Sequence, residues 1–146
     1  MSVQGRRPHP LVVAVALVVA LTACAPDRAP RPVDEAVRLQ DFKIHVGTRP
    51  LHSGVVVLGL RNEGPTVHEL LVARTNLPAD HLPLGKDGLS VDEDAKVVNV
   101  VKELEEVQLG DVHDLAVTLP AGHYVLFCNL EGHYLGGMHA DLVVQP

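Results

Sequence analysis

From residue 37 onward the chain consists of short apolar segments separated by turn-forming residues. Residues 37–46 alternate between apolar and polar positions, which is the period of a strand with one buried face. Residues 54–60 form a continuous β-branched run that ends at Asn62-Glu63-Gly64-Pro65, a composition typical of a turn. The pattern therefore begins with two strands rather than with helices.

The middle of the chain gives a less regular signal. Residues 74–94 are too rich in Pro, Gly and Asp for regular structure, so we expect a long excursion between two sheets. Residues 97–107 are ambiguous, because Val97, Val101 and Leu104 would line one face of a helix. The density of valine favours a strand, and a strand is what we expect there.

The remaining apolar segments complete an all-β pattern. In residues 66–73 the side chains of His68, Leu70 and Val72 would share one face of a strand. Many short strands joined by long returns predict an all-β fold, a Greek-key β-sandwich. The other strands expected are residues 114–119, 123–128 and 140–144.

The first residues look like a targeting segment and a linker. Arg6 and Arg7 precede an apolar run, Leu11 to Leu21, that is shorter than the roughly 20 residues a membrane-spanning helix needs. Leu21-Thr22-Ala23-Cys24 resembles the lipobox of bacterial lipoproteins, in which Cys24 becomes the lipidated N-terminus after cleavage. An uncleaved anchor and a plain signal cut nearby are the alternatives.

We therefore expect three parts: a lipoprotein signal peptide at 1–23, a Pro-rich flexible tether at 24–36, and one domain at 37–146. Acyl chains on Cys24 would hold the protein at the outer face of the cytoplasmic membrane. The net charge of −6 and the lack of clustered Lys and Arg exclude nucleic acid as a partner. We expect a monomer.

Sulfur is rare in this chain, and its distribution is informative. If Cys24 is acylated, Cys128 is the only remaining thiol, and Met138 is the only methionine besides Met1. His133 stands midway between them, five residues from each. Glycines between these donors would let the loop fold back on itself, so that all three reach one metal ion. The simpler alternative is that Cys128 is a small buried hydrophobic residue.

A fourth donor must come from elsewhere in the fold. His68 is the best candidate, because it follows a turn at the start of a strand, at the end of the sandwich. A thiolate, imidazoles and a thioether select a soft to borderline metal, and two His with one Cys and a weak Met describe a blue-copper centre. Zinc could occupy the same donors.

These two motifs carry a resemblance to a known family. A His after an Asn-x-Gly turn (Asn62 to Glu69), followed by Tyr-x3-Cys-x4-His-x4-Met (Tyr124 to Met138), resembles the cupredoxins. The equal four-residue gaps are more similar to auracyanin, rusticyanin and sulfocyanin than to plastocyanin. The resemblance implies an eight-stranded cupredoxin-like sandwich with one type 1 copper and no enzymatic activity, carrying single electrons between redox protein partners.

By the same resemblance, His68, Cys128 and His133 would be the strong copper ligands and Met138 the weak axial one. His133 would reach the surface with Leu130 and Leu135 as the electron port, although both leucines could instead belong to the core. Many cupredoxins have Asn after the first His, where it links the two ligand segments. Here that residue is Glu69, for which we expect a solvent-facing position.

Two other functions stay open at this point. The chain could hold copper for delivery, storage or resistance, although such proteins often use several methionines. It could also be a metal-free sandwich that serves as an adhesion or binding module, which leaves the Cys-His-Met spacing unexplained. A copper enzyme would need a second metal centre, and the remaining histidines lack ligand spacing. Those histidines are best interpreted as surface residues, with His139 also suited to support a ligand.

Overall fold

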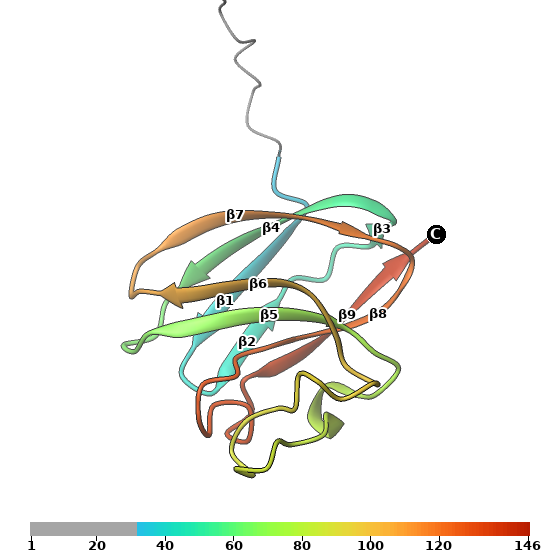
Figure 1. Ribbon diagram of the computed structural model, residues 1–146. Helices are drawn as coiled ribbons and strands as arrows, with labels where there is room; N and C mark the ends of the chain where they lie inside the picture. The colour runs from blue at the N-terminus through green and yellow to red at the C-terminus, as the bar shows by residue number, and fades with distance from the viewer. Residues whose placement is uncertain (1–31) are drawn as a thin grey trace, which may run out of the picture. The chain divides into compact units, whose positions relative to one another are not determined.

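The structure is a computed structural model, and it describes residues 32–146. The predicted signal peptide, Cys24 and most of the predicted tether lie outside the described residues. The described chain forms two β-sheets that face each other as a sandwich (Figure 1). Within residues 32–146 no helix has the length and apolar character required to cross a membrane.

The strands divide into a four-stranded and a five-stranded sheet. The first sheet has the order β2-β1-β4-β7 and the second the order β3-β9-β8-β5-β6. The strands are β1 Glu35–Gln40, β2 Lys43–Val46, β3 Leu51–His52, β4 Gly54–Asn62, β5 His68–Arg74, β6 Asn99–Val107, β7 Val112–Leu119, β8 Gly122–Phe127 and β9 His139–Gln145.

The two kinds of apolar pattern have different causes in the structure. Strand β1 alternates buried and exposed residues because only one of its faces meets the core. The centres of β5 and β8 are continuously apolar because both of their faces are covered. Their inner face meets the main core, and their outer face meets a second apolar cluster. This cluster is formed with residues 75–98, which connect β5 to β6 and which we call the excursion.

Most of the expected strands are present, with three differences. Residues 37–46 are not one strand but the hairpin of β1 and β2, with a turn at Asp41 and Phe42. Phe42 has φ of 59°, a value that L-residues rarely adopt. Strand β3 was not predicted, and β1 begins at Glu35 rather than Val37. Residues 99–107 are a strand, as expected, rather than a helix.

The pairing of strands brings three connections together at one end of the sandwich. β1 runs parallel to β4 with Leu39 opposite Asn62, so the β1–β2 turn lies beside the β4–β5 turn. β5 pairs antiparallel with β8, with Leu71 opposite Phe127, which brings the residue after β8 level with the start of β5. Asn62 fixes the β4–β5 turn, because its side chain donates to the carbonyls of Thr66 and Val107.

Candidate metal centre

Three of the predicted ligands converge at this end of the sandwich. Donor atoms of His68, Cys128 and His133 all lie within 4.8 Å of one another. Nδ1 of His133 is 3.5 Å from Sγ of Cys128, and the two imidazole rings have centroids 5.3 Å apart. It is the only group of three or more His, Cys, Asp or Glu donors in residues 32–146 with this geometry.

The ligand loop, which we define as residues 128–138 between β8 and β9, folds back twice as the spacing predicts. The amide of Cys128 donates to the carbonyl of Met138 at 3.1 Å, and the amide of Met138 donates to that of His133 at 3.0 Å. Gly132 and Gly137 have φ of +76° and +104°, which a residue with a side chain would adopt only with strain. Met138 is fully buried and belongs to the same core cluster as Cys128.

The donor atoms suit a metal ion. Both ring nitrogens of His68 are buried, and neither makes a well-directed hydrogen bond within the described protein. Burial lowers the pKa of His68, and the nearby His133 adds to this effect, while Asp41 opposes it. The ring is therefore kept neutral, as a metal-ligating imidazole must be.

Burial also favours the neutral form of the Cys128 thiol. Burial raises its pKa, although the backbone amides of Glu69 and Leu130 partly oppose this by hydrogen bonding. The thiolate therefore needs a cation beside it, and two imidazoles with one thiolate are a donor set for copper or zinc. On these grounds the residues present fit the copper site that the resemblance implies.

Glu69 is half-buried rather than solvent-facing. Burial raises its pKa most, a hydrogen bond from the backbone amide of Asn129 lowers it, and repulsion from Glu103 raises it further. Asn129 directly follows Cys128, so Glu69 lies near the cysteine segment.

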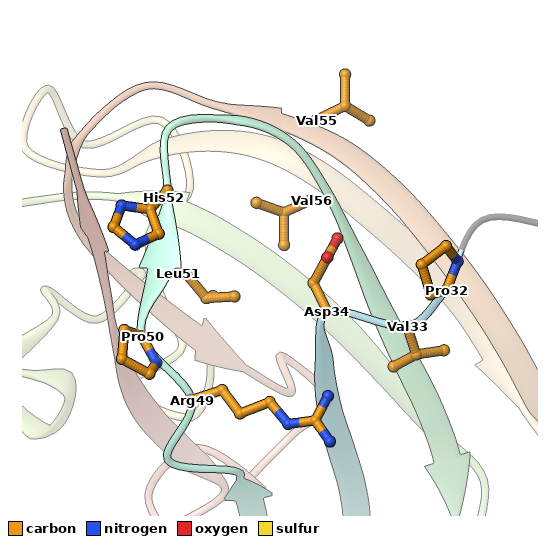
Figure 2. Close-up of a pocket in the computed structure, with 9 residues that line it drawn as sticks. All are labelled: Pro32, Val33, Asp34, Arg49, Pro50, Leu51, His52, Val55 and Val56. Atoms are coloured by element: carbon orange, nitrogen blue, oxygen red, sulfur yellow. The ribbon is translucent and has the colours of Figure 1, made fainter.

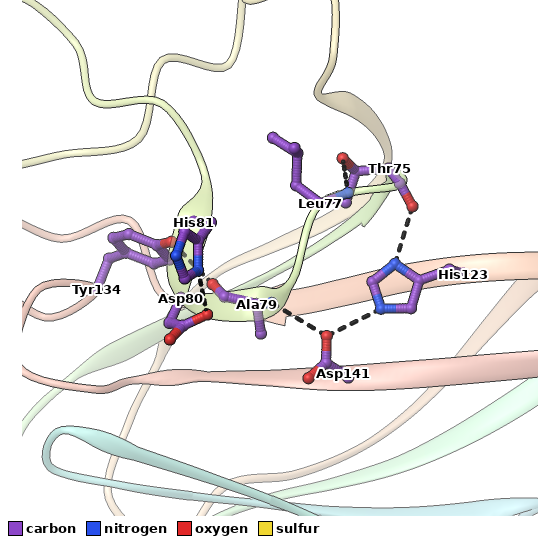
Figure 3. A network of polar contacts seen from close by, with 8 residues as sticks. All are labelled: Thr75, Leu77, Ala79, Asp80, His81, His123, Tyr134 and Asp141. Atoms are coloured by element: carbon purple, nitrogen blue, oxygen red, sulfur yellow. Dashed lines mark hydrogen bonds and ion pairs between the residues drawn. The ribbon is translucent and has the colours of Figure 1, made fainter.

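A second group of contacts fastens the ligand loop to the 75–98 excursion. The hydroxyl of Tyr134, the residue after His133, donates to the carbonyl of Ala79 at 2.8 Å (Figure 3). The same hydroxyl accepts from the amide of Leu82 at 2.8 Å. The side chain of Asn129 accepts from the amide of Val91 at 2.6 Å and donates to its carbonyl at 3.2 Å. Residues 75–98 thus hold the ligand loop from outside through side-chain hydrogen bonds.

The surface beside His133 differs in part from the expectation. Leu135 is 52% exposed, as an electron port requires, but Leu130 packs against the core. Phe42 is also 52% exposed, and its ring meets His133 edge-on with centroids 5.4 Å apart. Sequence reasoning missed Phe42, because nothing in the local pattern connects the β1–β2 turn with the ligand loop.

The other histidines of the described chain have partners away from the site. His123 contacts the carbonyl of Thr75 and the carboxylate of Asp141, both at 2.9 Å, and this network ties the excursion to β8 and β9 (Figure 3). His139 lies against the ring of Tyr134, so its contact with the site is indirect. His45, His52, His81 and His113 contact Gln40, Pro146, Asp80 and Asp111 respectively.

Solved structures of other proteins share this fold. An auracyanin from Roseiflexus castenholzii has 16% sequence identity and a TM-score of 0.56, and the match covers 76% of this chain and 95% of the auracyanin. Auracyanin A from Chloroflexus aurantiacus has 19% identity and a TM-score of 0.51, and the match covers 75% of this chain and 99% of auracyanin A. Rusticyanin from Thiobacillus ferrooxidans has 16% identity and a TM-score of 0.52 over 75% and 76%. No curated protein matches the sequence.

At these identities the solved structures establish the fold and nothing further. The family assignment comes from the sequence itself, because the model of the sulfocyanin (SoxE) domain matches residues 41–146. This match covers more than half of the chain, including every residue of the candidate metal centre. The chain therefore belongs to the sulfocyanin family of cupredoxins.

Proposed function

We propose that this protein is a membrane-tethered blue-copper electron carrier that moves single electrons between redox partner proteins. Cupredoxins bind one type 1 copper ion, and here His68, Cys128, His133 and Met138 would hold it. The observation that carries the proposal is the convergence of the two imidazoles and the thiol within 4.8 Å. Bound copper would supply a one-electron couple between Cu(II) and Cu(I).

The burial and the number of the candidate ligands support electron transfer. His68, Cys128 and Met138 are fully buried, so water is kept from three of the four donors. Four protein donors leave no open position for a substrate, which favours electron transfer over catalysis. His133 is partly exposed and is the donor through which an electron would reach a partner.

The first described residues lie at the end of the sandwich away from the candidate ligands. Pro32, Val33 and Asp34 line a hollow with residues of β3 and the beginning of β4 (Figure 2). His68 follows the opposite end of β4. A lipid on Cys24 would anchor the protein at the outer face of the cytoplasmic membrane. The lipobox-like sequence Leu21-Thr22-Ala23-Cys24 supports this part of the proposal.

The test is to add Cu(II) to the full-length protein purified in detergent and to record a visible spectrum and a voltammogram. We expect an intense thiolate-to-copper band and a reversible one-electron wave, both absent in Cys128→Ser. A colourless protein would contradict the proposal, and colour without reversible cycling would favour copper storage or delivery. Cell fractionation tests the tether, since Cys24→Ala should release the protein from the membrane.

A further inference from the structure

One fully buried ligand of the proposed site, His68, has a carboxylate within hydrogen-bonding distance of its ring. Oδ1 of Asp41 lies 3.1 Å from Nε2 of His68, although the ring N–H does not point squarely at this oxygen. The His68 side chain is fully buried, whereas that of Asp41 is 31% exposed. A carboxylate in the β1–β2 turn thus reaches an imidazole that begins β5.

Two residues of the β4–β5 turn favour this contact. The hydroxyl of Thr66 donates to the same Oδ1 of Asp41 at 2.9 Å, so the carboxylate is fixed from the β4–β5 turn. Gly64 makes room for the approach, because a Cβ at this position would lie 2.7 Å from Asp41 Oδ1 and 2.9 Å from His68 Nε2. Two turns that are distant in sequence therefore converge on one ring nitrogen.

The chemistry of a histidine ligand gives this contact a consequence. A metal-ligating histidine usually donates the N–H of its second nitrogen to a carboxylate or carbonyl, which fixes the tautomer and strengthens the ring as a donor. With Nε2 facing Asp41, the proton belongs on Nε2, and Nδ1 is the nitrogen left for the metal. A stronger and more negative donor favours Cu(II) over Cu(I), because it attracts the more highly charged copper ion more strongly.

We propose that Asp41, held by Thr66, is a positioning residue that orients His68, fixes its Nε2–H tautomer and lowers the reduction potential of the site. The proposal rests on the proposed copper function. It assigns to a turn residue a role that a carboxylate in an ordinary β-turn would not have.

The test compares Asp41→Asn with Asp111→Asn in the full-length copper-loaded protein. Asn keeps the size and the acceptor oxygen of Asp41 but removes its charge. Asp111 is a matched control, because it also lies in a connection between two strands, β6 and β7, and contacts a histidine, His113, that is not a candidate ligand. We expect Asp41→Asn to weaken the binding of Cu(II) relative to that of Cu(I) by about tenfold, which raises the reduction potential by about 59 mV. The reduction potential should change far less in Asp111→Asn.

Two further variants separate positioning from folding. Thr66→Val should shift the potential in the same direction as Asp41→Asn but by less, without removing any charge. Asp41→Ala should also disturb the spectrum, because the ring loses its orientation. Equal shifts in Asp41→Asn and Asp111→Asn would overturn the proposal, as would an unchanged potential in Asp41→Asn with only a lower unfolding midpoint.

One measurement does not depend on copper. Nitrogen-15 NMR of the zinc-loaded and the metal-free protein reports which nitrogen of His68 carries the proton. We expect the Nε2–H tautomer in the unmodified protein and a mixture in Asp41→Ala. A protein that never turns blue but retains this tautomer would contradict the electron-carrier function while leaving the positioning role of Asp41 intact. An Nδ1–H tautomer would overturn the inference itself.

Discussion

His68 enters the site from the first residue of a strand and is fully buried, whereas His133 enters from a loop and is partly exposed. The carboxylate of Asp41 faces the ring of His68, while the edge of the exposed Phe42 meets that of His133. The same turn therefore supports both imidazoles, one with charge and one with an apolar surface. One histidine is suited to fixing the geometry of the site, and the other to contact with a partner.

Replacing each histidine by glycine should separate these two roles most strongly. In His133→Gly, added imidazole can reach the vacated position from solvent, so millimolar imidazole should restore most of the blue colour. In His68→Gly, the vacated space is enclosed, so imidazole should restore little. Loss of the buried ring should also lower the free energy of unfolding of the metal-free protein by about 2–4 kcal/mol.

The measurement is a titration of both variants with imidazole at a fixed concentration of Cu(II). The visible spectrum reports how much of the blue colour returns in each variant. Chemical denaturation of the metal-free proteins provides the control, because His133→Gly should unfold close to the unmodified protein. Equal restoration of colour in the two variants would show that the difference in burial does not govern access to the site.

The two regions also differ in how they are braced. His68 is part of a paired strand, but the ligand loop depends on contacts such as the Tyr134 hydroxyl with Ala79 and Leu82. Tyr134→Phe leaves two buried backbone groups without their partner, so the free energy of unfolding should fall by about 1–3 kcal/mol. The copper band should also shift, since His133 adjoins Tyr134.

Tyr124→Phe is the matched control for this prediction. Its hydroxyl donates to the carbonyl of Pro120 in the β7–β8 connection, remote from the ligand loop. The control variant should lose about 1 kcal/mol of stability with no change in the visible spectrum. If both variants leave the spectrum unaltered, the excursion contributes to folding but does not hold the ligands in place.

Much of the fold followed from the sequence, because the alternation and the apolar runs record burial directly. The β1–β2 hairpin escaped prediction because its turn contains a single turn-forming residue, Asp41, followed by Phe42 rather than Gly or Asn. The alternation of apolar and polar residues changes phase at this turn, where Gln40 and Asp41 are consecutive polar residues, and the interpretation as one long strand overlooked this signal. Strand β3 escaped because two residues are too few for any period.

The candidate ligands were predictable because sulfur is so rare in the chain and the spacing so regular. The residues that surround the ligands were not. Asp41 and Phe42 lie near them only because strands distant in sequence pair in one register. For Tyr134 a weak signal exists, since it is one of only two tyrosines and adjoins a ligand, but its partners belong to an excursion with no periodic pattern.

Charge provides the smallest expected difference between the two regions. Strand β6, which pairs with the His68 strand, carries Glu103, Glu105 and Glu106, whereas the ligand loop carries only Glu131. Partial burial raises the pKa of Glu103 above its ordinary value of 4.5, and repulsion from Glu93 and Glu105 adds to the effect. The folded state therefore holds this proton more tightly than the unfolded state does.

It follows that the unfolding free energy falls as pH rises from about 4.5 through the raised pKa of Glu103. Glu103→Gln should remove this loss and make the protein more stable at pH 7, by only a few tenths of a kcal/mol because Glu103 is exposed and solvent screens its charge. The gain should vanish below pH 4.5, where the carboxyl is protonated in both states. Denaturation curves at several pH values measure it, and 1 M salt should reduce the repulsive part. A gain that persisted unchanged at low pH would mean that the introduced glutamine stabilises β6 by strand propensity rather than by removal of charge.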